Sequence, residues 1–147
     1  MEEKDVIISI TGMHDIGQGG DCIELVTPGK YHFEDGKSRF SYMESELTGL
    51  DGTRTSFTVD NCGCVLLREG STNSRMVFEA GKKHLFLYDT PFGSATMGIN
   101  TRSFKTQLSE HGGDMEIDYV VDFEHSVIGR QSLKIDVRER LQGGSLN

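Results

Sequence analysis

A run of strictly alternating residues near the C-terminal end constrains the fold of this chain more than any other feature. From Met115 to Glu124 every odd position is apolar, and four of the five even positions carry a carboxylate. Successive side chains of a β-strand point to opposite faces of a sheet, so a period of two is typical of a half-buried strand. The segment therefore predicts a strand with one face in the core and an acidic face in water.

The alternation resumes after Ser126, which predicts a second strand and a β-hairpin. A turn centred on Ser126 would place Asp122 opposite Arg130 and Asp118 opposite Lys134 on the solvent face. Exposed pairs of opposite charge contribute about 0.2–1 kcal/mol each, so they help to select the register more than they stabilise the fold. We therefore expect this pairing in the hairpin.

Short β-rich segments separated by glycine-containing turns fill the rest of the chain. Glycine is frequent, with 18 residues, and proline occurs only twice. The Pro28–Gly29 pair is predicted to break one of these segments. Neither 104–110 nor 137–141 shows a sustained helical stripe, so little helix is expected. The predicted strands cover residues 6–11, 22–27, 30–33, 38–44, 53–60, 64–68, 75–79, 84–89 and 95–104.

About ten short strands without helical crossovers are typical of a sandwich or a barrel. Short sequential turns favour an up-and-down strand order, and closure removes exposed edges that promote aggregation. The sequence therefore predicts an all-β fold, a small closed antiparallel up-and-down β-barrel, formed by residues 1–147 as one domain.

Charge and the N-terminal sequence exclude several classes of partner. The formal net charge is −8, and no run of lysine and arginine forms a basic stripe for nucleic acid or for an anionic membrane. The first five residues are acid-rich rather than basic, and no apolar run approaches the roughly 20 residues of a spanning helix. We expect a cytoplasmic protein that binds neither nucleic acid nor membranes.

Six short stretches, most of them in the middle of the chain, resemble a known family. They are Gly29–Tyr31, Ser41–Glu44, Val65–Gly70, Met76–Gly81, Tyr88–Gly93 and Met97–Thr101. Together they resemble the YwiB-like family of bacterial proteins of unknown function. The resemblance implies a lipocalin-like barrel of the calycin type, in agreement with the strand pattern, and it implies no activity.

The barrel interior is the candidate ligand site, with Tyr42, Arg68, Phe78 and Tyr88 as tentative binding residues. An eight-stranded barrel is wide enough to be filled by side chains or to hold one small ligand, and both alternatives stay open. An inward Arg68 could bind a carboxylate or a phosphate, but it could equally pair with an internal acid such as Glu79 or extend to water. A buried Tyr42 or Tyr88 hydroxyl needs a hydrogen-bond partner, which a backbone carbonyl also supplies.

Patterns for metals and catalysis are weak. Cys62 and Cys64 are spaced to share a strand face, but a metal site would need two further ligands that the sequence does not indicate. The five histidines are scattered, and neither a nucleophile elbow nor a phosphate loop occurs. We therefore expect no metal, no cofactor and no catalytic residue.

Two non-enzymatic functions remain from the sequence. The first is binding of a small apolar or amphipathic molecule inside the barrel, since eight phenylalanines, four tyrosines and six methionines can line an adaptable pocket. The alternative is a protein-interaction module or homodimer that uses an outer apolar patch. Its candidate residues are Ile7, Val65, Leu67, Phe86 and Val120.

Overall fold

All regular structure in the described part of the chain is β-strand. The computed structural model describes residues 3–15, 20–45, 51–71, 73–90, 93–124 and 126–140. None of these residues forms a helix long and apolar enough to cross a membrane. The strands are β1 (Lys4–Asp15), β2 (Gly20–Glu34), β3 (Lys37–Met43), β4 (Thr53–Val59), β5 (Gly63–Gly70), β6 (Ser74–Glu79), β7 (Lys83–Thr90), β8 (Gly93–Ser109), β9 (Gly112–Phe123) and β10 (Ser126–Glu139).

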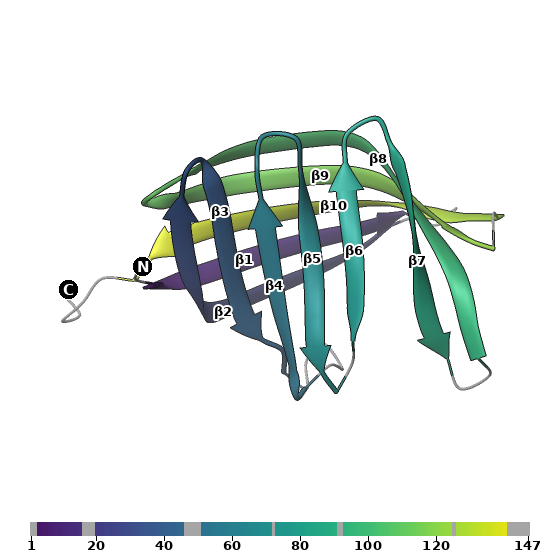
Figure 1. Cartoon of the computed structure of the whole chain (residues 1–147), viewed down its shortest axis with the longest axis horizontal. Helices are drawn as coiled ribbons and strands as arrows, with labels where there is room; N and C mark the ends of the chain where they lie inside the picture. The colour runs from purple at the N-terminus through teal and green to yellow at the C-terminus, as the bar shows by residue number, and fades with distance from the viewer. Residues whose placement is uncertain are drawn as a thin grey trace.

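The strands form one antiparallel sheet that curls into a nearly closed barrel (Figure 1). Strands β1 to β6 pair in chain order, β7 to β10 do likewise, and β1 pairs with β10. Within the described residues only β6 and β7 follow one another without a shared ladder. We call the space between these two strands the seam. The predicted all-β up-and-down barrel is confirmed, with a ring that closes everywhere except at the seam.

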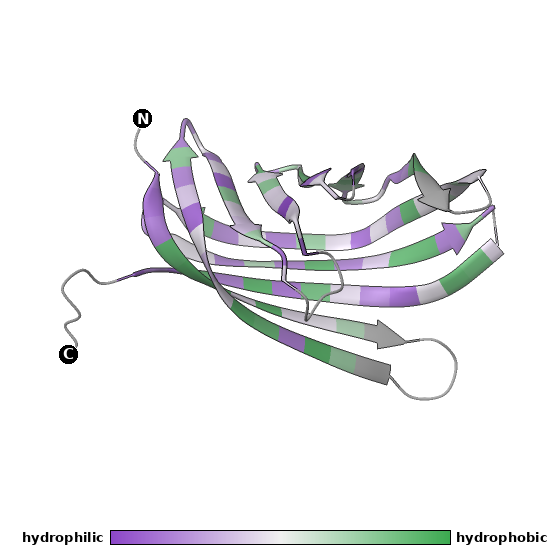
Figure 2. Ribbon diagram, turned by 90° about the horizontal axis from the view of Figure 1, so that it is seen from below, coloured by the Kyte–Doolittle hydropathy of each residue, from purple (hydrophilic) through white to green (hydrophobic). Residues whose placement is uncertain are grey.

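The two sides of the barrel differ in strand length. The short strands β3–β6 cross the long strands β8–β10 and β1 at a steep angle, and β2 belongs to both sides (Figure 1). Figure 2 shows apolar and polar residues in alternating bands along the long strands. The period-two pattern of the sequence thus becomes one apolar inner face and one polar outer face.

The inward side chains form a continuous core. In β9, Met115, Ile117, Tyr119 and Val121 are all buried, while Glu116 between them is exposed. The half-buried strand predicted from the alternation is therefore confirmed. The largest fully buried side chains come from both sides of the barrel: Val6, Ile8, Tyr31, Phe40, Phe57, Val59, Phe78, Ile99, Met115, Ile117, Ile135 and Val137.

The predicted register of the β9–β10 hairpin was wrong by two residues. Arg130 lies opposite Val120 and not Asp122, and Lys134 lies opposite Glu116. A bulge in β10 just after the turn absorbs one residue, and the turn itself is shifted. Because a shift by two keeps every side chain on its own face, the acidic face still points outward.

The outer acids of β9 find other partners. Arg130 Nη2 lies 2.8 Å from Asp118 Oδ2, diagonally across the hairpin. Lys83 Nζ on β7 lies 2.7 Å from Asp122 Oδ2. This second ion pair passes over Gly98 of β8, where an added Cβ would lie 2.6 Å from an Asp122 oxygen. The pair therefore ties β7 to β9 across the strand between them.

The predicted break at Pro28–Gly29 is also wrong, because β2 runs through it without interruption. Pro28 pairs with Ile7 of β1, and the ladder with β3 reaches only as far as Lys30. At Pro28 the strand therefore has one neighbour, where a missing N–H costs little. Gly29 permits a close approach, since an added Cβ would lie 2.5 Å from the carbonyl oxygen of Ser41.

Candidate functional site

An apolar belt crosses the inner wall of the short strands. Phe40, Phe57, Leu66 and Met76 lie opposite one another from β3 to β6. Directly paired residues share a face, so these four side chains form one continuous row. The rings of Phe40 and Phe57 stack with their centroids 5.0 Å apart.

A polar belt runs parallel to the apolar belt, displaced from it by two residues on each strand. It consists of Tyr42, Thr55, Arg68 and Ser74, which are again opposite one another in the ladders. Glu44, which follows β3, is also buried and continues the polar end of the wall. The inner surface therefore changes from apolar to polar over one repeat of the strand.

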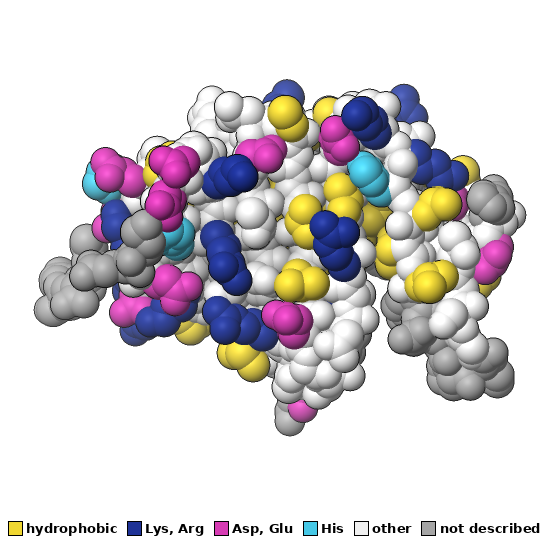
Figure 3. Space-filling view, in the orientation of Figure 1, with side chains coloured by type: hydrophobic (Ala, Val, Ile, Leu, Met, Phe, Trp, Pro, Cys, Tyr) yellow, Lys and Arg dark blue, Asp and Glu magenta, His cyan; other side chains and the backbone are white. Residues whose placement is uncertain are grey.

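A cavity of about 370 Å³ lies between this wall and the long strands. Its size falls within the roughly 300–1,000 Å³ of small-molecule pockets. Figure 3 shows hydrophobic side chains gathered around the hollow beside the seam. The cavity is lined by Ile10, Gly12, Ile23, Leu25, Tyr42, Glu44, Phe57, Leu66, Arg68, Met76, Phe78, Tyr119, Gln131 and Leu133.

Gly12 marks an unfilled place in this lining. It pairs with Leu133 on one side and Ile23 on the other, and all three line the cavity. A Cβ added at Gly12 would have no heavy atom within 4 Å. A larger residue at this position would therefore extend into empty space.

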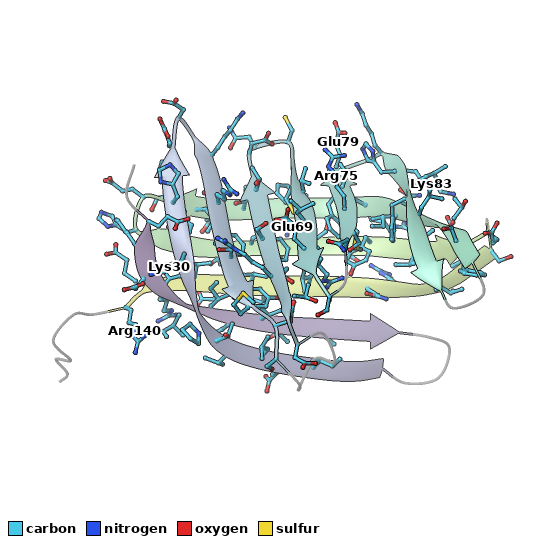
Figure 4. The ribbon with its side chains drawn as sticks, turned by 60° about the horizontal axis from the view of Figure 1, so that its bottom comes forward. Lys30, Glu69, Arg75, Glu79, Lys83 and Arg140 are labelled. Atoms are coloured by element: carbon cyan, nitrogen blue, oxygen red, sulfur yellow. The ribbon has the colours of Figure 1, made fainter. Side chains whose placement is uncertain are left out.

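Arg68 brings a positive charge to the lining of the cavity. Its Nε is buried and makes no hydrogen bond in the described structure. The predicted alternative, pairing with Glu79, is wrong, because that carboxylate instead binds His84 at 3.0 Å and Lys82 at 3.2 Å. Figure 4 shows Glu79 at the top of β6, and Ser74 of the polar belt lies at the other end of this strand. A buried donor without an acceptor costs about 1–3 kcal/mol.

The carboxylate of Glu44, by contrast, is well satisfied. Thr55 Oγ1 donates a hydrogen bond to Glu44 Oε2. Burial raises the pKa of Tyr42 above its ordinary value, and the charge of Glu44 and a hydrogen bond from the phenol to Glu44 raise it further. The positive charge of Arg68 opposes this shift only in part. Tyr42 therefore keeps its proton and donates to Glu44.

Tyr119 supplies a polar group from the opposite wall. Its hydroxyl donates a hydrogen bond of 2.8 Å to Gln131 Oε1, and its ring meets Phe78 edge-on with the centroids 4.9 Å apart. Burial raises the pKa of Tyr119 to about 12, although the nearby charge of Arg68 acts to lower it. Both walls therefore bring neutral hydroxyls toward Arg68.

Of the four residues predicted from the sequence, Tyr42, Arg68 and Phe78 come together around the cavity. The backbone of Tyr88 pairs with Ala95 in β7, but its side chain lies outside the described part of the structure. Sequence reasoning did not identify Glu44, Tyr119 or Gln131 as lining residues.

The cysteine pair does not form a site. Cys64 is buried in β5, and burial raises the pKa of its thiol to about 12. Cys62 is exposed in the preceding turn, where the Asp60 side chain accepts a hydrogen bond from its N–H. Within the described residues, no three His, Cys, Asp or Glu side chains are grouped as metal ligands would be.

A second hollow, of about 550 Å³, lies outside the barrel against β2 and β3. Lys30 and Arg140 on its rim are labelled in Figure 4. It is the larger of the two, but Lys30 is already paired with Asp5, and the surface is open to water. The inner cavity joins an apolar wall to a cation whose Nε has no acceptor among the described residues, which makes it the better candidate site.

Comparisons with known proteins agree with this architecture. A family model described as "Domain of unknown function (DUF1934)" matches residues 8–135. The uncharacterized beta-barrel protein YwiB of Bacillus subtilis (strain 168) is 23% identical over 118 residues, which cover 80% of this chain and 82% of that protein. The crystal structure of ywiB protein from Bacillus subtilis matches with a TM-score of 0.72 at 19% identity, covering 91% of this chain and 92% of that one.

Proposed function

We propose that this chain, which belongs to the family described as domain of unknown function DUF1934, takes one small apolar or amphipathic molecule into its barrel. The observation that carries the proposal is the cavity of about 370 Å³ between the apolar belt and the long strands. Removal of apolar ligand surface from water contributes about 25 cal/mol per Å². The analogy with lipocalin-like barrels supports the same function at the level of the fold.

We propose binding without catalysis. His32, His84 and His111 form their ion pairs with surface carboxylates, and the cavity lining contains no histidine among the described residues. The hydroxyls of the polar belt therefore have no neighbouring imidazole to act as a base. The odd number of cysteines favours action in the cytoplasm.

The test is saturable binding of a neutral apolar probe. N-phenyl-1-naphthylamine should bind the delipidated protein with one-to-one stoichiometry and with increased fluorescence. Native mass spectrometry of protein purified from its own host should show an added mass that is lost on denaturation. An unliganded mass together with unsaturable probe fluorescence would refute the proposal.

Self-association is a second candidate function, favoured by the outer face of β7. Leu85 and Leu87 are 57% and 68% exposed on a strand whose edge at the seam is unpaired in the described structure. Such an edge invites pairing with a second copy of the chain. Light scattering across a concentration series tests this, and a monomer at high concentration would contradict it.

The outer patch predicted from the sequence supports this candidate less well. Phe86 was wrongly assigned to it, because this side chain packs against the core. The other four residues are partly buried within the wall: Ile7, Val65, Leu67 and Val120.

A further inference from the structure

The cavity lining contains two charged side chains among the described residues, Arg68 and Glu44. Their hydrogen-bonding states differ. Glu44 accepts from the hydroxyls of Thr55 and Tyr42, whereas the buried Nε of Arg68 has no acceptor among the described residues. The hydrogen-bonding group that remains open in the cavity is therefore a cationic donor, and a ligand would have to supply its acceptor.

A carboxylate is the acceptor that suits a guanidinium best. The planar fork of arginine can offer two parallel N–H groups to the two oxygens of a carboxylate. Neutral acceptors such as alcohols gain a weaker bond, because charge-assisted hydrogen bonds are roughly twice as strong as neutral ones. The polar belt thus distinguishes an acid from an uncharged amphiphile.

Glu44 limits the charge that the cavity accepts. It lies on the same wall as Arg68 and already brings one negative charge to the polar end. A ligand with two negative charges would place its second charge near Glu44 without a second cation in the described lining. The lining therefore favours a carboxylate over a doubly charged phosphate.

We propose that the ligand is a monocarboxylate with an apolar body, whose carboxylate binds Arg68 while the apolar part lies against the apolar belt. This inference rests on the proposed function and specifies its ligand class. The two parallel belts determine the orientation of the ligand. The paired residues Phe57 and Leu66 of the apolar belt are two residues away from the paired residues Thr55 and Arg68 of the polar belt.

The experiment measures displacement of bound N-phenyl-1-naphthylamine by decanoate, decanol and decyl phosphate at about pH 8. Because the probe is neutral, its own binding tests the cavity independently of Arg68. Decanoate should displace it at a concentration at least tenfold below that of decanol or decyl phosphate. Arg68→Met should weaken decanoate binding by about ten- to one-hundred-fold, as loss of a charged hydrogen bond implies, and change decanol and the probe little.

Two further variants control this result. Arg75→Met removes the same charge from the exposed outer face of β6, labelled in Figure 4, and should leave decanoate binding unchanged. Arg68→Lys keeps the charge but loses the fork, and should bind decanoate with intermediate affinity. Circular dichroism and thermal melting establish that each variant is folded.

The outcomes separate the two proposals. If the probe binds but Arg68→Met leaves decanoate affinity within threefold, or Arg75→Met lowers it equally, the inference about Arg68 is refuted and the cavity proposal stands. Decyl phosphate binding as tightly as decanoate refutes the preference for a single charge. Failure of both probe and decanoate to bind refutes the proposed function and the inference with it.

Discussion

Filling the empty place at Gly12 should block binding and stabilise the protein at the same time. Three contributions set the size of the effect for Gly12→Leu. Removing a glycine from a strand gains about 0.5–1 kcal/mol. Burying about half of a leucine side chain gains about 1 kcal/mol, and fixing its rotamer costs about 0.5–1 kcal/mol. The net gain is about 1 kcal/mol, or roughly 2–4 °C in Tm.

The same leucine occupies part of a cavity of only about 370 Å³. We expect the affinity for N-phenyl-1-naphthylamine to fall at least tenfold, measured by fluorescence titration beside thermal unfolding by circular dichroism. Thr11→Leu is the matched control, because the adjacent residue of a strand points to the outer face. It should leave probe binding unchanged.

The reasoning would be refuted by a Gly12→Leu protein that binds the probe as the original does. A fall in Tm would refute the energetic part, because it would mean that the leucine meets atoms where an added Cβ has open space. Most substitutions that abolish binding also destabilise, so a loss of binding with a rise in Tm is a specific signature.

Three other predictions follow from the wall of the barrel. Ellman's reagent should modify two of the three thiols in the native protein and reach Cys64 only on unfolding, because burial raises its pKa to about 12. Lys83→Met should lower the free energy of unfolding by about 1–3 kcal/mol in urea titrations, since it leaves Asp122 buried without its cation, and Asp122→Asn in the same protein should recover part of the loss. Hydrogen bonds from Arg130 hold the pKa of Asp118 below its ordinary 3.8. The ionised Asp118 therefore stabilises the fold fully above pH 3.8, and this contribution is lost as the pH falls through the lowered pKa. Asp118→Asn should therefore destabilise at pH 7 and progressively less below pH 4 in acid titrations followed by circular dichroism.

The alternating pattern was sufficient to predict most of the strands, most of their faces and the up-and-down order, because all three depend on local sequence. The register of the β9–β10 hairpin was harder to predict, because a bulge displaces the ladder. Exposed charge pairs contribute only about 0.2–1 kcal/mol each, which is too little to determine the register. The effect of Pro28 also depended on tertiary structure, namely on whether a second strand needed its N–H.

The same register explains the gap in the predicted site. Tyr119 lies opposite Gln131, and this pairing allows the hydrogen bond between their side chains. The register expected from the sequence would have placed another residue opposite Tyr119, so nothing in the sequence indicated that Gln131 lines the cavity. Arg68 and Tyr42 could be predicted because each lies on an inward face of its own strand. Glu44 lies two residues after Tyr42, at a position that shares its face, so the same alternation could have identified it.

For the proposed ligand, the seam would be an entry that leaves the strand ladders of the barrel intact. Elsewhere in the described ring, parting two neighbouring strands would rupture a whole series of backbone hydrogen bonds. Between β6 and β7 no such ladder exists, so opening the wall there would cost side-chain packing and the Glu79–His84 ion pair but no series of backbone hydrogen bonds. Entry and release of the proposed ligand would then require no unfolding of the barrel.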